Sequence, residues 1–475
     1  MPPNDLTLAT ASELAELVRA KSVSPVEVTA HFLDRIAAHD GELNAFITVA
    51  AEEAMAQAHR AEEAVIAGEP LGPLHGVPIG IKDLDATKGL RTTYGSMLMR
   101  DFVPDHDEIA VERIRAAGAI IVGKTNTPDY GWKGTTENLL TGPCANPWDT
   151  TRTSGGSSGG SASAVAAHLV PIANGSDAGG SIRIPSSYCG VYGIKPTYGR
   201  VPRLLPPGAW RPLSQGGPLA SNVRDAAVLL SVLAGPDPRD PTSIRSVPPS
   251  YEDALADLSL GGLRIAWSPA MDDQPVDPEV RDATAAAARA FEALGAAVDE
   301  AAPDVTTSDA VWMYATLSLT GLVARLGPTI DEGKADMMPP RLLEWVSEAI
   351  AWPATRHAEA LGKLEWHRRR FDDFFESYDL LLLPTMATTA FPIEQNPRSI
   401  DGRSVHPSWG FTPFCHHANL TGRPAASIPC GFDADGLPIG LQIVGQPGDE
   451  VTVLRASAAY EAAHPWAGRQ PAKFP

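Results

Sequence analysis

A stretch rich in glycine and serine, residues 151–199, limits the folds open to this chain of 475 residues. Low-complexity sequence of this kind is typical of a flexible linker. Here, apolar and aromatic residues interrupt it at short intervals: Val165, Leu169, Val170, Ile172, Ile182, Ile184, Tyr188, Val191 and Tyr192. Apolar and aromatic residues are not typical of a solvated linker. A buried core needs them, and the glycines and serines between them allow the backbone to pack closely and turn sharply. We therefore predict that this stretch lies inside the core of a globular domain.

Short apolar runs before and after this stretch predict the strands of a buried mixed sheet. They lie at residues 77–81, 119–122, 263–267, 380–383 and 439–444. Runs of this length next to helical segments are typical of buried strands. No domain boundary or internal repeat is evident, so we expect one large α/β domain, with room for helical insertions.

Helices are predicted on both sides of the sequence. Ser24 is placed as an N-cap, Pro25 occupies the first helical position, and Glu27 can close a capping box. Further helices are expected at about 50–67, where Gly68 ends the helix, and at about 221–233 and 278–295.

Charge and composition exclude several classes of protein. The formal net charge is −19, and there is no basic stripe that could hold a phosphate backbone, so no nucleic-acid partner is expected. Residues 1–10 lack the pattern of a secretory signal, and no apolar run reaches the roughly 18 to 20 residues of a membrane span. The four cysteines are scattered, which favours a reducing compartment. We expect a cytoplasmic protein without a membrane partner.

Three features carry candidate chemistry. Lys82 ends the apolar run 77–81, where a charged ammonium is costly to bury. A serine–glycine cluster occupies residues 154–161, and a glycine pair precedes Ser181. Acyl transfer needs a nucleophile, a base and donors for an oxyanion. Ser181 could serve as the nucleophile, Lys82 as the base and Ser157 as the proton relay, although a turn, a loop or a surface lysine would explain each feature taken alone.

Taken together, these segments resemble the amidase-signature family. The similarity lies in residues 76–83, 155–162 and 177–185, with further matches at 123–126, 193–197, 199–201, 419–425 and 436–442. Matching residues in that family form a Ser–Ser–Lys triad whose middle serine follows a cis peptide bond. The resemblance implies that Lys82 is the base, that Ser157 is the bridge after a cis Gly156–Ser157 bond, and that Ser181 is the nucleophile.

The resemblance also implies the surroundings of the triad. The oxyanion hole would use the backbone N–H groups of Ala178, Gly179, Gly180 and Ser181. Asp177 and Arg183 are expected to hold the loop by charge-assisted hydrogen bonds, with Ser158 supporting the triad. The implied fold is a single α/β domain over residues 1–475, with a central mixed β-sheet covered by helices on both faces. N-terminal helices would span about 1–68, and the catalytic core about 70–235.

Other catalytic classes fit less well. Residues 155–159 satisfy the Gly-x-Ser-x-Gly pattern of α/β-hydrolases, but the preceding residues 151–154 are polar rather than an apolar strand. That mechanism also needs a histidine, for which His406, His416, His417 and His464 are the candidates. No Walker phosphate loop, His-Glu-x-x-His or Cys-x-x-Cys motif is present, so neither a metal nor a cofactor is expected.

Within the family, the main alternative is the amidase subunit of a tRNA-dependent amidotransferase, which hydrolyses glutamine and passes ammonia to a partner. Residues 312–318 do not resemble the glutamine-recognising segment of those subunits. We therefore favour a free hydrolase acting on a small-molecule amide, with ester or carbamate (urethane) cleavage also open to it. A homodimer is expected only because dimers are the commonest closed assembly.

Bulky residues in loop-like segments are candidates for binding an apolar substrate. They are Tyr130, Trp132, Trp210 and Met337. Aromatic rings bury large areas and methionine adapts its shape, so such residues favour apolar or aryl amides. The alternative is that these residues only cap the sheet or pack a helical insertion.

Overall fold

The computed structural model describes residues 6–204 and 213–474. Within them, eleven strands form one sheet in the order β1-β3-β2-β8-β10-β9-β16-β17-β13-β11-β12. Their bounds in that order are Phe46–Val49, Ile120–Thr125, Pro78–Lys82, Ile172–Asp177, Gln215–Ala220, Tyr192–Lys195, Ala425–Phe432, Pro438–Val444, Leu380–Pro384, Arg264–Trp267 and Ala297–Glu300. Strand β2 is parallel to β3 and β8, and β11 is parallel to β12 and β13, whereas the other neighbours are antiparallel. The predicted mixed sheet is confirmed.

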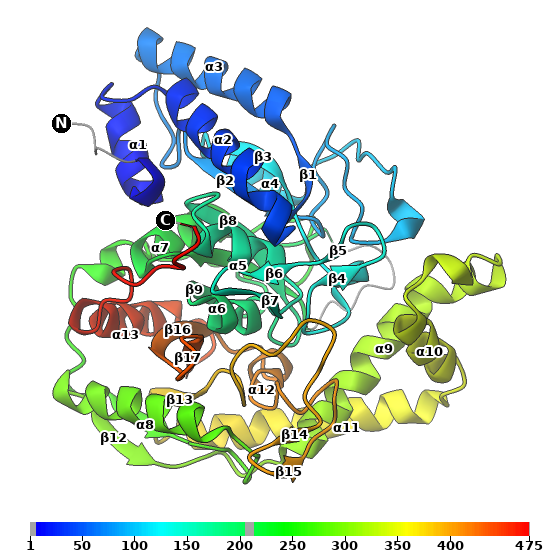
Figure 1. Cartoon of the computed structure of the whole chain (residues 1–475). Helices are drawn as coiled ribbons and strands as arrows, with labels where there is room; N and C mark the ends of the chain where they lie inside the picture. Colours follow the sequence, from blue (N-terminus) through cyan, green and yellow to red (C-terminus); the bar gives the residue numbers. More distant parts are fainter. Residues whose placement is uncertain (1–5, 205–212, 475) are drawn as a thin grey trace.

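Helices pack along the whole sheet (Figure 1). The helices α1 to α13 are Ala11–Arg19, Pro25–Leu43, Ala51–Ala67, Ile109–Ala116, Gly159–Ala166, Arg183–Cys189, Val223–Leu233, Pro278–Ala293, Thr307–Asp331, Pro340–Ile350, Ala354–Phe375, His416–Leu420 and Glu450–Ala463. Short two-stranded sheets add β4 with β5, β6 with β7, and β14 with β15, at Glu137–Asn138, Gly142–Pro143, Ala145–Asn146, Asp149–Thr153, Ser399–Ile400 and Arg403–Ser404. In Figure 1, α1 to α3 lie at the β1 end of the sheet and α8 lies at the β12 end.

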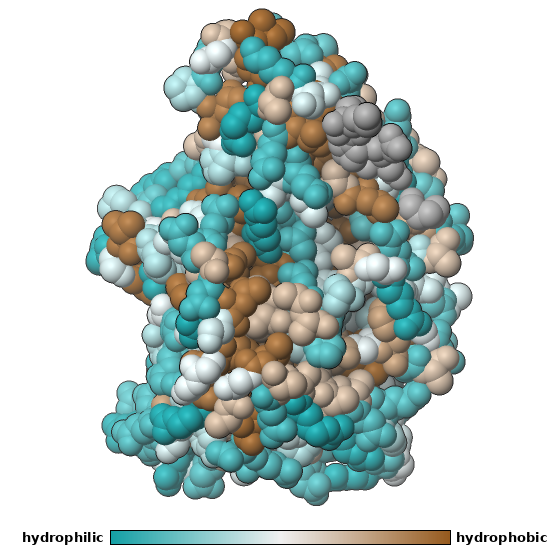
Figure 2. Space-filling view, turned by 90° about the vertical axis from the view of Figure 1, so that its left-hand side faces the viewer, coloured by the Kyte–Doolittle hydropathy of each residue, from teal (hydrophilic) through white to brown (hydrophobic). Residues whose placement is uncertain are grey.

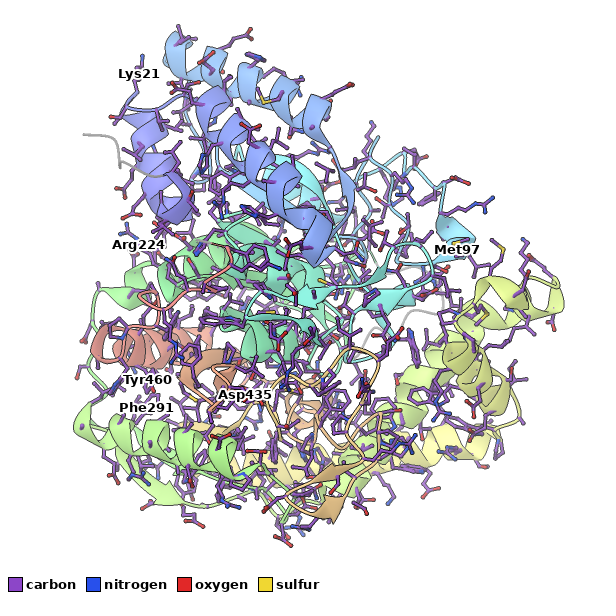
Figure 3. The ribbon with its side chains drawn as sticks, in the orientation of Figure 1. Lys21, Met97, Arg224, Phe291, Asp435 and Tyr460 are labelled. Atoms are coloured by element: carbon purple, nitrogen blue, oxygen red, sulfur yellow. The ribbon has the colours of Figure 1, made fainter. Side chains whose placement is uncertain are left out.

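Both faces of the sheet are covered, because alternate residues of a strand point to opposite sides. In β13, Leu380 and Leu382 belong to a core cluster shared with α1, α7, α8 and α13. Leu381 and Leu383 belong to a different cluster, shared with α6 and α11. Figure 3 labels Phe291 of α8 and Tyr460 of α13, whose rings stack at 5.5 Å between centroids. A strand buried on both faces explains why this run is apolar at every position.

Of the predicted N-terminal helices, α2 begins and α3 ends where expected, but a strand that was not predicted, β1, lies between them. Helix α2 starts with the Ser24–Glu27 capping box and with Pro25 at its first position. Helix α3 ends at Gly68, which adopts a left-handed conformation with φ +71°. These helices contribute Phe32 and Ala54 to the cores on opposite faces of the β1–β3 end.

The glycine- and serine-rich stretch is a buried core, as predicted. It forms α5, β8, α6 and β9 in succession, and every residue of α5 and α6 is buried. Small side chains let α5 pack closely against the sheet. This arrangement places the serine-bearing segments beside the end of β2.

A helical insertion, α9 to α11, lies between β12 and β13 and stands at the lower right of Figure 1. Its residues pack into two clusters on either side of α9, one around Met313 and Leu317 and the other around Leu326 and Leu342. The sequence predicts helical insertions only in general terms, and the structure gives this one its bounds. It forms a wall facing the Ser181 region, as described below.

The face of the molecule seen in Figure 2 is mainly polar. Figure 2 shows a face on which hydrophilic residues predominate, with apolar residues interspersed among them in its middle part. Among the described residues, no helix is both long enough and apolar enough to cross a membrane.

Candidate active site

Lys82 lies at the last position of β2, between the neighbouring strands β3 and β8, and is fully buried. Its Nζ contacts three oxygens: Ser157 Oγ at 2.8 Å, Ser158 Oγ at 2.7 Å and the carbonyl oxygen of Ser176 at 3.2 Å. The strand thus delivers the lysine directly to the two serines of the cluster at residues 154–161.

Burial lowers the pKa of Lys82 to about 7, although the nearby charge of Asp85 acts in the opposite direction. Removing an ammonium from water disfavours its charged form. The amine is therefore substantially neutral at neutral pH, with a lone pair available to accept a proton.

A polar network behind Lys82 holds the end of β2 in place. Asn174 Oδ1 accepts the backbone N–H of Lys82 at 2.8 Å, and Asn174 Nδ2 donates to Asp85 Oδ2 at 2.7 Å. Arg203 then donates to the other oxygen of Asp85 at 3.0 Å. Sequence reasoning did not identify these three supporting residues. The one available signal is Asp85, an acidic residue three positions after a strand-end lysine.

Ser157 follows a cis peptide bond from Gly156, as the family resemblance implies. Its side chain reaches the cavity described below, yet the residue is only 2% exposed. The neighbouring Ser158 donates its backbone N–H to the carbonyl of Ser181 at 3.1 Å. That bond joins the segment of Ser157 to the segment of Ser181.

Ser181 precedes helix α6 and lines the same cavity as Ser157. Among the residues that the structure describes, its hydroxyl has no hydrogen-bond partner. The group is therefore open to a ligand in the cavity.

A buried ion pair shapes the loop before Ser181. Arg183 donates from Nη2 to Asp177 Oδ1 and from Nε to Asp177 Oδ2, both at 3.0 Å. Asn419 Nδ2 also donates to Asp177 Oδ1 at 2.8 Å. Burial alone would raise the pKa of Asp177, but the adjacent Arg183 holds it well below its usual range. The expectation that this pair positions the loop, rather than facing the cavity, agrees with both side chains being fully buried.

The loop also presents backbone donors. The N–H groups of Ala178, Gly179 and Ser181 have no acceptor within the described parts of the chain. The N–H of Gly180 differs from the expected pattern, because it donates to Asp177 Oδ1 at 2.7 Å. Its role is to fix the loop, which leaves the other three groups as the candidate oxyanion donors.

Close contact with α9 explains the glycine at position 179. A Cβ atom there would lie 2.4 Å from Cζ of Tyr314, which is a collision. Tyr314 therefore lies directly over the loop, and any larger side chain at position 179 would displace one of the two.

A cavity of about 140 Å³ opens in front of Ser181. Tyr130 and Trp132, which the sequence suggested as substrate-binding residues, line this cavity. Met337 does not line it: it ends a short 3-10 helix, Ala335–Met337, and its neighbour Met338 is the buried methionine of that turn. Trp210 lies outside the described residues.

Most residues of the cavity wall were not predicted from the sequence. One face of α9 supplies Tyr314, Ser318, Gly321 and Arg325, at spacings of four, three and four residues. That helical spacing is the signal that could have identified them. Leu319 and Leu322 of α9 also line the cavity, and further lining residues come from distant segments: Leu84, Tyr94, Ser176, Arg203, Ser214, Trp345 and Trp409.

Three tryptophans separate this cavity from an adjoining groove of about 1000 Å³. Trp132 meets Trp345 edge to face at 5.2 Å, and Trp345 stacks on Trp409 at 5.1 Å between centroids. All three line both spaces. The wall next to Ser181 is therefore aromatic and continuous with the outer surface.

The Gly-x-Ser-x-Gly alternative finds no support in this geometry. Strand β7, which precedes the motif, pairs with β6 in a separate two-stranded sheet and is not part of the central sheet. No histidine is among the described residues that line the cavity. Burial lowers the pKa of His416 and of His417 to about 3, so both are neutral packing residues at neutral pH.

Comparison with known proteins identifies the family. The amidase family model matches residues 27–454. The chain is 38% identical over 476 residues to an acylamidase of Rhodococcus erythropolis, covering 99% of both proteins. It is also 39% identical over 478 residues to a glutamyl-tRNA(Gln) amidotransferase subunit of Thermosynechococcus vestitus, covering 96% of this chain and 98% of that protein. The solved structure of a bacterial aryl acylamidase of the amidase-signature family superimposes with a TM-score of 0.92 at 32% identity, covering 97% of each chain. The chain therefore belongs to the amidase-signature family and is a hydrolase that cleaves amide C–N bonds.

Proposed function

We propose that this amidase hydrolyses amides with an apolar or aryl part through an acyl-enzyme on Ser181. The observation that carries the proposal is the contact of buried Lys82 with Ser157 at 2.8 Å, next to an open Ser181 hydroxyl in an aromatic cavity. A neutral amine behind two serines can activate the outer one as a nucleophile.

The proton path follows from this order of groups. Lys82 takes the proton of Ser157, and Ser157 takes the proton of Ser181 as the Ser181 oxygen attacks the substrate carbonyl carbon. When the C–N bond breaks, the same proton returns through Ser157 to the leaving nitrogen. Water then attacks the ester on Ser181 by the reverse path, releasing the carboxylic acid and restoring the serine.

The developing oxyanion needs donors that are in place before the reaction. The open N–H groups of Ala178, Gly179 and Ser181 support a site for it beside the nucleophile. The Asp177–Arg183 pair would keep that loop rigid, so the donors need no reorganisation as charge develops.

The cavity wall supports an apolar or aryl substrate. Tyr130, Trp132, Trp345 and Trp409 offer ring faces and edges, on which aromatic groups pack in offset or T-shaped geometry. Esters and carbamates fit the same chemistry, because only the leaving group differs before a common deacylation. The name of the relative from Rhodococcus erythropolis, an acylamidase, supports amide cleavage as the activity.

Glutamine hydrolysis, as in an amidotransferase, is the second candidate, because the amidotransferase relatives are as similar to this chain as the acylamidase is. Free glutamine carries an ammonium as well as a carboxylate. Among the described residues lining the cavity, none is Asp or Glu, so the ammonium would lack a counter-charge. This disfavours glutamine as the substrate.

A substrate panel tests the proposal. We expect a higher kcat/KM for an acyl nitroanilide, an aryl carbamate or an aryl ester than for glutamine, asparagine or acetamide. Ser181→Ala, the control, should abolish all of these activities. A preference for glutamine of about tenfold or more would refute the apolar site and favour the amidotransferase role.

A further inference from the structure

One side chain of the cavity has a charge that neither the proposed chemistry nor the fold uses. Arg325 lies on the cavity face of α9, one helical turn after Gly321. Its guanidinium lies over Tyr130 at 4.1 Å and over Tyr94 at 5.2 Å from the ring centroids. Those two rings stack on each other at 6.1 Å. Arg325 is thus held in place by π faces.

No carboxylate neutralises Arg325. Among residues 6–204 and 213–474, it forms neither an ion pair nor a hydrogen bond. Residues 205–212 contain no Asp or Glu that could serve instead. Burial lowers the pKa of Arg325, and the neighbouring groups that oppose this shift are the phenols of Tyr130 and Tyr94 rather than a carboxylate.

The buried arginines that the structure describes are all paired with acids. Their ion pairs are Arg183–Asp177 at 3.0 Å, Arg200–Glu450 at 3.3 Å, Arg203–Asp85 at 3.0 Å and Arg423–Asp372 at 2.5 Å. Arg203 also lines the cavity, but Asp85 already neutralises it. Among the described lining residues, Arg325 is therefore the cation that has no acid partner.

Arg325 is partly buried, so its unpaired guanidinium loses part of its hydration, and an anionic ligand in the cavity would supply the missing acceptor. Burial lowers the pKa of Arg325, yet a guanidinium stays protonated in proteins and keeps five N–H donors. The tyrosine faces compensate part of the lost hydration but accept none of the in-plane hydrogen bonds. A planar, bidentate acceptor such as a carboxylate matches that donor edge.

We infer that the amide substrate carries a carboxylate, or an equivalent planar anionic group, and that Arg325 is the residue that selects for it. This inference rests on the proposed function, since it places the anionic group in the cavity of Ser181. It further requires a substrate without a free ammonium, because the described cavity lining offers no acid to pair with one. The preferred substrate is then a monoanionic amide with an aromatic or apolar body, not a zwitterionic amino acid.

Two matched substrate pairs test the inference. The first pair puts the charge on the acyl side and compares N-succinyl-4-nitroanilide with N-pentanoyl-4-nitroanilide. The second puts it on the amine side and compares 4-acetamidobenzoate with 4-methylacetanilide. In at least one of the two pairs, we expect the wild-type kcat/KM for the anionic substrate to exceed that for the neutral substrate by about tenfold or more. This preference should weaken as salt is added.

Variants separate selection from packing. Arg325→Met should remove the preference by lowering kcat/KM for the anion about tenfold, while the neutral partner changes little. Arg325→Lys should keep part of the preference, since lysine keeps the positive charge but lacks the planar guanidinium that can donate to both oxygens of a carboxylate. The matched control is Arg356→Met, because Arg356 also lies over a ring, that of Trp352 at 3.9 Å, but does not line the cavity. Its selectivity should equal that of the wild type.

The outcomes distinguish this inference from the proposed function. If the wild type hydrolyses the neutral and anionic members of both pairs equally well, the role of Arg325 is overturned and the amidase function stands. If Arg325→Met lowers both members alike, the arginine only packs the two tyrosines, which also overturns it. If no amide of either pair is hydrolysed, the proposed function itself fails.

Discussion

The pH dependence of catalysis should follow the ionisation of Lys82. Burial brings its pKa from 10.5 to about 7, so about half of the molecules hold a neutral amine at pH 7. An unshifted lysine would be neutral in only about one molecule in 3000 at that pH. Below pH 7, kcat/KM should fall about tenfold per pH unit, to roughly one hundredth at pH 5. Lys82→Met should lose several powers of ten in kcat/KM at every pH.

The lowered pKa of Lys82 favours catalysis but reduces the stability of the folded protein. The folded pKa is lower than that of the unfolded chain, so the unfolded state binds more protons between about pH 7 and 10.5. The free energy of unfolding contributed by this group therefore rises with pH across that window. A shift of this size corresponds to a folding cost of about 5 kcal/mol at and below pH 7. Part of it should be recovered in Lys82→Met, less the hydrogen bonds to Ser157 and Ser158 that the lysine makes.

Initial rates between pH 5 and 9 on one nitroanilide would measure the acidic limb, and urea melts at pH 7 and 10 would measure the stability change. Lys195→Met is the matched control, because Lys195 is equally buried, also has a pKa of about 7, and does not line the cavity. Its acidic limb should remain. A limb that disappears only in Lys195→Met, or Lys82→Met activity within tenfold of the wild type, would refute the assignment of the base.

Three further changes test the surrounding groups. A fluorophosphonate should form one covalent adduct, on Ser181, and peptide mapping that places it on Ser157 instead would revive the Gly-x-Ser-x-Gly alternative. Gly179→Ala should reduce kcat about a hundredfold, because the added Cβ collides with Tyr314 and displaces an oxyanion donor. Partial recovery of kcat in the double variant with Tyr314→Ala would identify that collision as the cause. Full activity of the single variant would contradict this explanation. Arg183→Met should lower the free energy of unfolding by about 3 to 5 kcal/mol, since it leaves the buried carboxylate of Asp177 unpaired. An unchanged urea midpoint would show that the pair is not needed.

The sequence predicts local features well where one residue pattern decides the outcome. The Ser24 capping box and the apolar run before Lys82 form helix α2 and strand β2 with nearly the expected ends. Strand β13 was also predicted, because the run from Leu380 to Leu383 is apolar at every position and is buried on both faces of the sheet. The resemblance likewise implied the cis bond before Ser157, which spacing and composition could not.

Helix α9 is hard to recognise from its apolar residues, for a physical reason. It buries Met313 and Leu317 on one side and Leu319 and Leu326 on another, so no single apolar stripe marks it. Arg325 was missed because an arginine on a helix is ordinarily solvated. The cavity joins segments that are far apart in the chain, from Tyr94 to Trp409, and short-range patterns carry no information about such contacts.

The position of the last two strands has a consequence for how the protein is made. Strands β16 and β17 end at residue 444, yet they lie in the middle of the sheet, between β9 and β13. While the ribosome is still adding residues 425–444, the β1–β10 half and the β11–β13 half have no strand to join them. Gln442 of β17 also supplies an acceptor for Arg183, close to Ser181. The two halves of the sheet can therefore be joined only after residues 425–444 have been made, although Lys82, Ser157 and Ser181 all precede them in the chain.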